Sequence, residues 1–372
     1  MNLQSKTAGR LAKAALSGIV LGAAVAACGG GSDQPMTTTM PPAITSAFTA
    51  TALVTDQSSG AAHTDTHLVN AWGLAFNPTA FVWVANNGTS TSTLYDGNGV
   101  PQTLVVAIPA GTSGAAGVTG IVYNGTQDFK VTQNGATGAS PFIFAGEAGT
   151  VAGWSPAVNR ANAVTAVDTG GSAVYKGLAI AAYAGANYLY AADFHNNRID
   201  VYDAGWHKTT LPGAFADPNL PAGYGPFGIQ AVGDRIYVAY AQRETAGNDE
   251  VKGAGLGVVD VFDTAGTLIR RLASGGALNT PWGMAVAPAN FGDFANALLV
   301  ANFGDGKINA YNTSTGAFIG TLSKADHTPI VIDGLWGIAF GNGVNNQPAN
   351  TLFYTAGPND EAHGIYGRID LQ

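Results

Sequence analysis

The sequence predicts an all-β fold, a six-bladed β-propeller with four-stranded blades. Three observations favour it. A short phrase centred on a glycine returns six times, with its glycines 47 to 57 residues apart. Further short apolar runs follow each copy, and a spare strand-like segment precedes the first copy. Near-even repetition at this length is typical of stacked blades, solenoid coils or an array, and we favour six blades over seven blades or a β-solenoid.

The glycine phrase predicts the first strand of each blade, next to a crowded central axis where glycine lets neighbouring blades approach closely. The clearest copies are 70–76, 280–286 and 334–340, and the weaker copies begin at Val118, Tyr175 and Pro226. The shared glycines are Gly73, Gly120, Gly177, Gly228, Gly283 and Gly337.

Later runs in each repeat predict the remaining strands. Second strands are expected at 81–86, 141–147, 188–193, 235–240, 298–302 and 351–356. Third strands are expected at 93–96, 149–154, 198–203, 258–263, 307–312 and 367–371, with fourth strands at 102–108 and 267–272. The last repeat lacks a fourth strand, so we expect the segment 47–55 to pair with it and close the ring, which removes an exposed sheet edge.

Composition agrees with a turn-rich β protein. The 372 residues are 46% hydrophobic and 11% charged and include 51 glycines, a pattern that does not suit long helices. The net charge of −8 and the even scatter of basic residues argue against a nucleic-acid partner. One cysteine permits no disulfide within the chain, and we expect a monomer.

The first 27 residues have the layout of a secretory signal, with basic Lys6, Arg10 and Lys13 before an apolar stretch. The ending Val25-Ala-Ala-Cys28 resembles a bacterial lipoprotein signal, which implies a lipid on Cys28. An ordinary signal peptide and a short membrane anchor are the alternatives. Removing this segment makes the net charge −11. We therefore expect a signal peptide at 1–27, a lipid-anchored flexible linker at 28–46 and the propeller at 47–372. In the lipoproteins that this signal resembles, an Asp after the cysteine implies retention in the inner membrane, so the resemblance with Gly29 at that place favours the outer membrane.

The segments Trp282–Val286 and Leu299–Tyr311 resemble repeats of NHL-type and streptogramin-lyase-like propellers. Over about residues 48–372 the chain also resembles a bacterial family of exported proteins. The resemblance implies a propeller, but such propellers include lyases, lactonases and plain binding modules.

In a four-stranded blade, the start of strand one and the loop between strands two and three share one face of the ring. We therefore expect polar side chains from both places to converge on one mouth. The first set is Asn70, Lys176, Asn279 and Asp333. The second is Asn86, Asn87, Glu147, Asp193, His195, Tyr240, Asn302, Asp305, Asp360 and His363. The candidate binding residues among them are Asn70, Asn86, Tyr240, Asn302 and Asp333.

These oxygen-rich side chains suit a hard divalent cation such as Ca²⁺ or Mg²⁺, with Glu147 and Asp193 as candidate ligands. The resemblance to propeller lactonases adds Asn302 to that set. The alternative is that Asn and Asp form ordinary turns. His63 and His67 flank Asp65, but a loop pair of histidines is a weak metal signal.

Catalytic candidates are His195 or His363 with Glu147, because the streptogramin-lyase resemblance implies a His and a Glu acting with Mg²⁺. Trp72, Trp282 and Trp336 could stack on a sugar or pack the blades, and their repeat position favours packing. We expect an exported, lipid-anchored module that binds a small molecule, glycan or protein at the cell envelope. The alternative is a metal-dependent lyase or lactonase at the central mouth.

Overall fold

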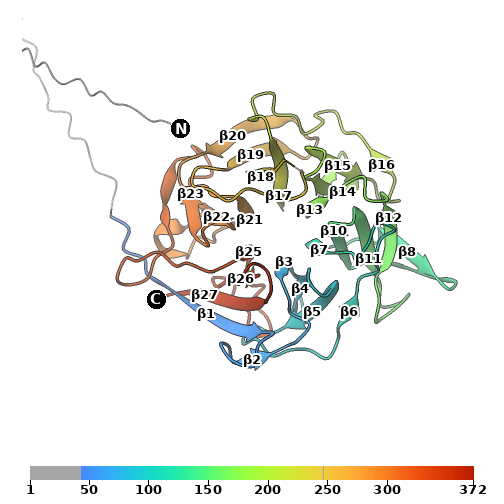
Figure 1. The fold of residues 1–372 in the computed structure, drawn as a ribbon, viewed down its shortest axis with the longest axis horizontal. Helices are drawn as coiled ribbons and strands as arrows, with labels where there is room; N and C mark the ends of the chain where they lie inside the picture. Colours follow the sequence, from blue (N-terminus) through green and yellow to red (C-terminus); the bar gives the residue numbers. More distant parts are fainter. Residues whose placement is uncertain (1–42, 246) are drawn as a thin grey trace, which may run out of the picture. The chain divides into compact units, whose positions relative to one another are not determined.

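The computed structural model describes residues 43–245 and 247–372, and residues 44–372 form one compact unit. Six β-sheets surround a central axis in this unit, and each sheet is one blade (Figure 1). Among the described residues, the one helical segment is the 3₁₀ turn η1 (Gly292–Phe294), and no helix there has the length and apolar character needed to cross a membrane. The predicted six-bladed propeller is confirmed.

Each blade runs from an inner first strand to an outer fourth strand, and these four strands pair antiparallel with their neighbours. Blade one contains β3 (Ala71–Phe76), β4 (Val82–Asn86), β5 (Thr91–Tyr95) and β6 (Val106–Ala107). Blade two contains β7 (Val118–Tyr123), β10 (Phe142–Gly146), β11 (Thr150–Trp154) and β12 (Val164–Asp168). Blade three contains β13 (Tyr175–Tyr183), β14 (Ala186–Asp193), β15 (Arg198–Tyr202) and β16 (Lys208–Thr209).

The second half of the ring repeats this order. Blade four contains β17 (Tyr224–Val232), β18 (Arg235–Gln242), β19 (Val258–Asp263) and β20 (Leu268–Ser274). Blade five contains β21 (Pro281–Val286), β22 (Leu298–Asn302), β23 (Ile308–Tyr311) and β24 (Phe318–Thr321). Blade six begins with β25 (Leu335–Phe340), β26 (Leu352–Ala356) and β27 (Ile365–Leu371).

The outer strand of blade six comes from the other end of the propeller. β1 (Phe48–Thr55) pairs antiparallel with β27, with Phe48 opposite Leu371 (Figure 1). The short strand β2 (His63–Thr64) then adds parallel to β1. The predicted closure is confirmed, and it ties the two ends of the propeller together while leaving β27 with no free edge.

One element was missed. A hairpin of β8 (Lys130–Gln133) and β9 (Ala136–Ala139) lies between the first and second strands of blade two. Its turn is Asn134-Gly135, with φ values of 52° and 82°. Asn-Gly is the preferred turn of a two-residue hairpin, so the signal was present. It was overlooked because the flanking strands are short, partly exposed and lack a strong apolar alternation.

Neighbouring blades meet at the axis with almost no space between their first strands. A Cβ placed on Gly228 would lie 1.9 Å from the carbonyl oxygen of Trp282, in the first strand of the next blade. A Cβ on Gly120 would lie 2.4 Å from the backbone nitrogen of Leu178. The repeated glycine is therefore a steric requirement of the ring, because any side chain at that position would push two blades apart.

We predict that Gly228→Ala lowers the free energy of unfolding by about 2–4 kcal/mol, because the new methyl group overlaps backbone that cannot move without shifting a blade. Urea denaturation measures the change. Gly125→Ala is the matched control, since its Cβ would meet only the Tyr123 side chain, at 3.3 Å. Equal, small effects of both substitutions would contradict the role given to the axial glycine.

Candidate functional site

The residue before each axial glycine lies at one end of the axis. In chain order these residues are Trp72, Thr119, Lys176, Phe227, Trp282 and Trp336. The aromatic members join Phe194 and Phe303 in a buried cluster that we call the aromatic plug. The Trp72 and Trp336 rings stack with centroids 3.5 Å apart, and Phe303 stacks on Trp336 at 3.8 Å.

The tryptophans are engaged within the protein. Trp282 Nε1 donates to the carbonyl oxygen of Lys176 at 2.8 Å, and Trp336 Nε1 donates to Asn70 Oδ1 at 3.1 Å. All three tryptophans at this repeat position are buried, with at most 8% of their surface exposed. These three tryptophans therefore pack the blades together, because none of their indole faces is open to a sugar.

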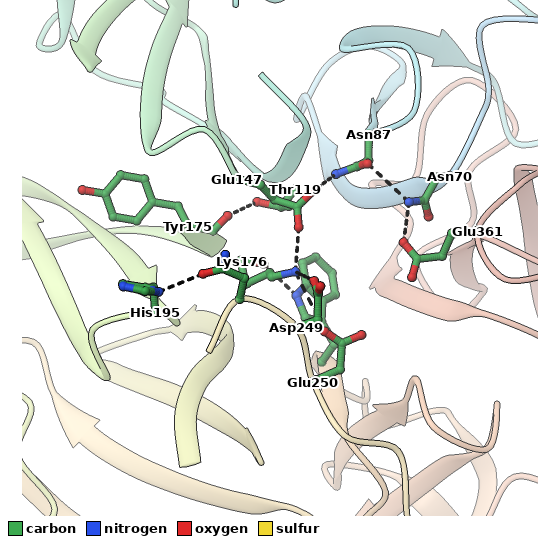
Figure 2. Close-up of polar contacts among 12 residues, drawn as sticks. Asn70, Asn87, Thr119, Glu147, Tyr175, Lys176, His195, Asp249, Glu250 and Glu361 are labelled. Carbon is green, nitrogen blue, oxygen red and sulfur yellow. Dashed lines mark hydrogen bonds and ion pairs between the residues drawn. The ribbon is translucent and has the colours of Figure 1, made fainter. Parts of the chain in front are cut away.

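Lys176 is the one charged residue at this repeat position, and it lies against the plug. Its side chain is 2% exposed, and Nζ lies 5.3 Å from the centre of the Trp72 ring. Nζ donates to Glu147 Oε1 at 2.6 Å and to Asp249 Oδ1 at 3.4 Å, and lies 3.9 Å from Glu250 Oε2 (Figure 2). Carboxylates from blades two and four thus surround one buried ammonium group.

Amide side chains extend this network towards blade six (Figure 2). Asn87 Nδ2 donates to the second oxygen of Glu147 at 2.9 Å. Asn70 Nδ2 donates to Asn87 Oδ1 at 3.3 Å and to Glu361 Oε2 at 2.6 Å. We call the connected set Asn70, Asn87, Glu147, Lys176, Asp249, Glu250 and Glu361 the axial mouth.

The charges of the axial mouth are strongly coupled. Burial acts to lower the pKa of Lys176, but the nearby Glu147 and Glu250 outweigh it, so the pKa is raised and the ammonium stays charged. Burial raises the pKa of Glu250 to about 7, against the opposing pull of Lys176. Burial also raises the pKa of Glu361. A lysine nucleophile is therefore unavailable here, whereas Glu250 exchanges a proton near neutral pH.

The backbone that carries Glu361 has an uncommon conformation. Asn359, Asp360 and Glu361 have φ values of 58°, 48° and 66°, so three successive residues are left-handed. Asn and Asp tolerate this region, so the cost, about 1–2 kcal/mol, falls mainly on Glu361. The β26–β27 loop keeps this conformation while Glu361 accepts a hydrogen bond from Asn70. Strain of this kind gathers at functional sites.

Of the predicted binding residues, the structure brings Asn70 into the axial mouth. Asn86 and Asn302 share one repeat position, the last residue of the second strand, and turn into their own blades. Asn86 Nδ2 donates to the hydroxyls of Thr91 and Thr93 at 3.1 and 3.0 Å. Asn302 Nδ2 donates to Asp305 at 3.1 Å. Both side chains therefore hold loops in place.

The remaining candidates have hydrogen-bond partners outside the axial mouth or are buried elsewhere, although His195 lies near Lys176 (Figure 2). Asp333 accepts from the backbone N–H of Asn359 at 2.9 Å, and Tyr240 is buried between blades three and four. His195 Nδ1 lies 2.8 Å from Asn248 Oδ1, and His363 Nδ1 lies 2.9 Å from Asp56 Oδ2. Neither histidine has a hydrogen bond to Glu147 among the described residues.

The residues do not fit the expected divalent cation. Asp193 bonds Asn196 at 2.7 Å and pairs with Arg198 at 3.2 Å, whereas Glu147 bonds Lys176 and Asn87. Within residues 43–245 and 247–372, no three His, Cys, Asp or Glu side chains are placed to hold a metal ion. In the axial mouth, the ammonium group of Lys176 occupies the position where these carboxylates would otherwise meet a cation.

Sequence reasoning missed Asp249, Glu250 and Glu361. The available signal was Lys176 itself, a charged residue where four other blades have an aromatic one, since a buried lysine needs acidic partners. The long connection between β18 and β19 was a second signal, because a loop of that length can reach over the axis.

The fold and the axial mouth define a six-bladed propeller with a polar site at its axis. No protein-family model matches the chain. Two proteins of Acanthamoeba polyphaga mimivirus are similar to it. "Uncharacterized protein R648" is 34% identical over 327 residues, covering 85% of this chain and 78% of that protein. "Uncharacterized protein L690" is 30% identical over 325 residues, covering 85% and 84%. The chain belongs to the family of these two proteins.

Solved structures share the architecture. A chain of the COPII outer coat vertex on membranes has a TM-score of 0.51 at 11% identity, covering 82% of this chain and 70% of that one. A streptogramin B lyase has a TM-score of 0.49 at 12% identity, covering 87% and 97%. Likeness at such identity concerns the propeller fold alone.

We predict that Glu250→Gln changes how stability depends on pH. The pKa of Glu250 is raised in the native protein, so its contribution to stability is full at acidic pH and is lost as the pH rises towards about 7. Between about pH 4 and pH 8 the wild type should lose about 1–3 kcal/mol more than the variant. Urea denaturation across this range measures the difference. Parallel pH profiles of the two proteins would contradict the buried, proton-binding Glu250.

Proposed function

We propose that this protein is an exported propeller that binds a ligand at the axial mouth. The observation that supports the proposal is the 2% exposed Lys176, whose Nζ contacts Glu147 at 2.6 Å directly beside the plug. A charge buried in this way is costly, and the same position in four other blades is filled by an aromatic ring. A buried charge of this kind weakens packing at the axis. Its presence therefore favours a role in ligand binding over a role in packing alone.

The axial mouth favours a ligand with a positive charge. Glu147, Asp249, Glu250 and Glu361 provide four carboxyl groups, and the nearby cations are Lys176 and Lys252, whose Nζ lies 4.2 Å from the centre of the Phe303 ring. Asp249 and Glu147 remain 66% and 33% exposed, so they can meet a ligand from solution. A ligand with an amine group would bring positive charge to the axial mouth, where carboxyl groups outnumber lysines.

Binding is proposed in preference to a metal-dependent lyase or lactonase. The carboxylates that such chemistry would need are occupied by Lys176 and Arg198, and the candidate histidines pair with other side chains. A rigid ring with charged and amide groups held by mutual hydrogen bonds suits recognition without a chemical step.

The export and anchoring part of the proposal rests on the sequence. The signal at 1–27, the lipidation residue Cys28 and nearly all of the linker at 28–46 lie outside the described residues. A lipid on Cys28 would hold the propeller at the outer membrane of a bacterial envelope, with the linker giving it reach. The proposed partners are the membrane through this lipid, and a small molecule, glycan or protein through the mouth.

To test the ligand site, we would titrate spermidine into residues 44–372 by isothermal calorimetry. We expect saturable binding that weakens with salt, and about tenfold lower affinity in Glu361→Gln, because one attracting charge is lost while the bond from Asn70 can persist. The exposed Glu244→Gln is the control with the same loss of charge. Absence of binding, or equal binding by both variants, would refute a cationic ligand at the axial mouth.

To test anchoring, we would express the full chain in Escherichia coli and label it with a radioactive fatty acid. The wild type is expected to carry label and to enter the detergent phase of a Triton X-114 extract. Cys28→Ser should lose both properties, because the thiol is the site of lipid attachment. An unlabelled wild-type protein in the aqueous phase would refute the lipoprotein proposal.

A further inference from the structure

A cavity opens between blades three and four, away from the axial mouth. Its volume is about 260 Å³, and its walls come from the β14–β15 loop, the β16–β17 connection, and the neighbouring ends of β17 and β18. These segments lie at the starts of first strands and the ends of second strands, on the face of the ring that also carries the axial mouth. We call this cavity the 3/4 cleft. The residues used below are Arg198, Phe215, Asp217, Leu220, Pro226 and Tyr240.

The Tyr240 hydroxyl lines the 3/4 cleft without a protein partner. Tyr240 is 3% exposed, and its hydroxyl has no hydrogen bond to any residue in the described parts of the chain. Burial and the carboxyl groups of Asp260 and Asp217 raise its pKa well above the ordinary value, so the hydroxyl keeps its proton and can donate. Because the hydroxyl is not sealed from the cleft, it is free to donate a hydrogen bond to a ligand oxygen there.

Asp217 supplies an acceptor in the same wall. Its side chain is 2% exposed and pairs with the Arg271 guanidinium, and it also accepts from the backbone N–H of Asn219 at 2.9 Å. These bonds outweigh burial and lower its pKa, so the carboxylate is ionised. A carboxylate oxygen has room for more than one hydrogen, and the group can therefore still accept from a ligand hydroxyl.

The charged side chains around the 3/4 cleft are paired with one another. Arg198 pairs with Asp193 at 3.2 Å and with Asp200 at 2.8 Å, and Lys208 also pairs with Asp200, at 2.6 Å. On the other wall, Arg271 pairs with Asp217 and, at 3.3 Å, with Asp260. Burial and the nearby Asp217 raise the pKa of Asp260 to about 7, so below neutral pH its carboxyl group is protonated and adds no charge.

The remaining walls are apolar. Phe215, Leu220 and Pro226 face the same cavity as the Tyr240 hydroxyl and the Asp217 carboxylate. The volume lies just below the range of about 300–1,000 Å³ typical of pockets for drug-sized ligands. The 3/4 cleft thus combines donors, acceptors, a hydrophobic side and charged groups that already have partners, in a space for a single small ring.

We propose that the 3/4 cleft binds one neutral sugar ring. Sugar hydroxyls both donate and accept, so they can satisfy Tyr240 and Asp217 together, while the C–H face of the ring packs against Phe215 and Pro226. A charged ligand would lose its hydration, while the charged side chains of the cleft already have partners within the protein. This site is independent of the ligand proposed for the axial mouth.

The test uses Tyr240→Phe and a matched variant, Tyr237→Phe. Both residues lie on β18 and both hydroxyls lack a hydrogen bond among the described residues, but Tyr237 packs towards blade five. We would measure saturation-transfer difference NMR and affinity with glucose, galactose, mannose and N-acetylglucosamine. At least one sugar should bind the wild type and Tyr237→Phe equally, and Tyr240→Phe about three- to tenfold more weakly.

Two further measurements separate the two sites. Glu361→Gln, which alters the axial mouth, should leave the affinity for the sugar unchanged. Glucuronate, which has the ring of glucose and a carboxylate, should bind more weakly than glucose. Failure of all four sugars to bind the wild type would overturn the proposal, as would equal binding by Tyr240→Phe and Tyr237→Phe, or loss of sugar binding in Glu361→Gln.

Discussion

Close approach of the six first strands at the axis is the constraint on which the rest of this structure depends. A Cβ on Gly73 would lie 2.6 Å from the Thr119 carbonyl oxygen, and one on Gly283 would lie 2.4 Å from that of Trp336. No side chain fits at these glycines, so the first strands come together there. The residue before each glycine then lies at one end of the axis. Large aromatic side chains at that place then close the ring as the plug.

Lys176 is an exception to this arrangement, and the axial mouth is built around it. Its ammonium group lies where Trp72, Phe227, Trp282 and Trp336 place apolar rings, so it needs carboxylates to offset its burial. Those carboxylates come from loops of blades two and four, and the amides connect them to blade six. A lysine in place of an aromatic residue at one repeat position thus brings together side chains from distant parts of the chain.

A single step along the chain decides whether a side chain faces the axis or its own blade. Asn86 and Asn302 end their second strands and bond within their blades, whereas the next residues, Asn87 and Phe303, contribute to the axial mouth and the plug. Glu147 likewise follows the last residue of β10. Because alternate residues of a strand point to opposite sides, a sequence pattern that locates the loop does not by itself select the residue.

The sequence alone determined the ring: the glycine repeat, the short strands and the spare N-terminal segment predicted six blades and their closure, because local patterns of strand and turn repeat at a fixed period. It also located Asn70, Lys176 and Glu147 near one mouth. The tertiary structure alone decided the partners, such as Glu361 for Asn70, which are 291 positions apart. Such contacts depend on the rotation between blades and on the course of individual loops, and neither is encoded in local periodicity.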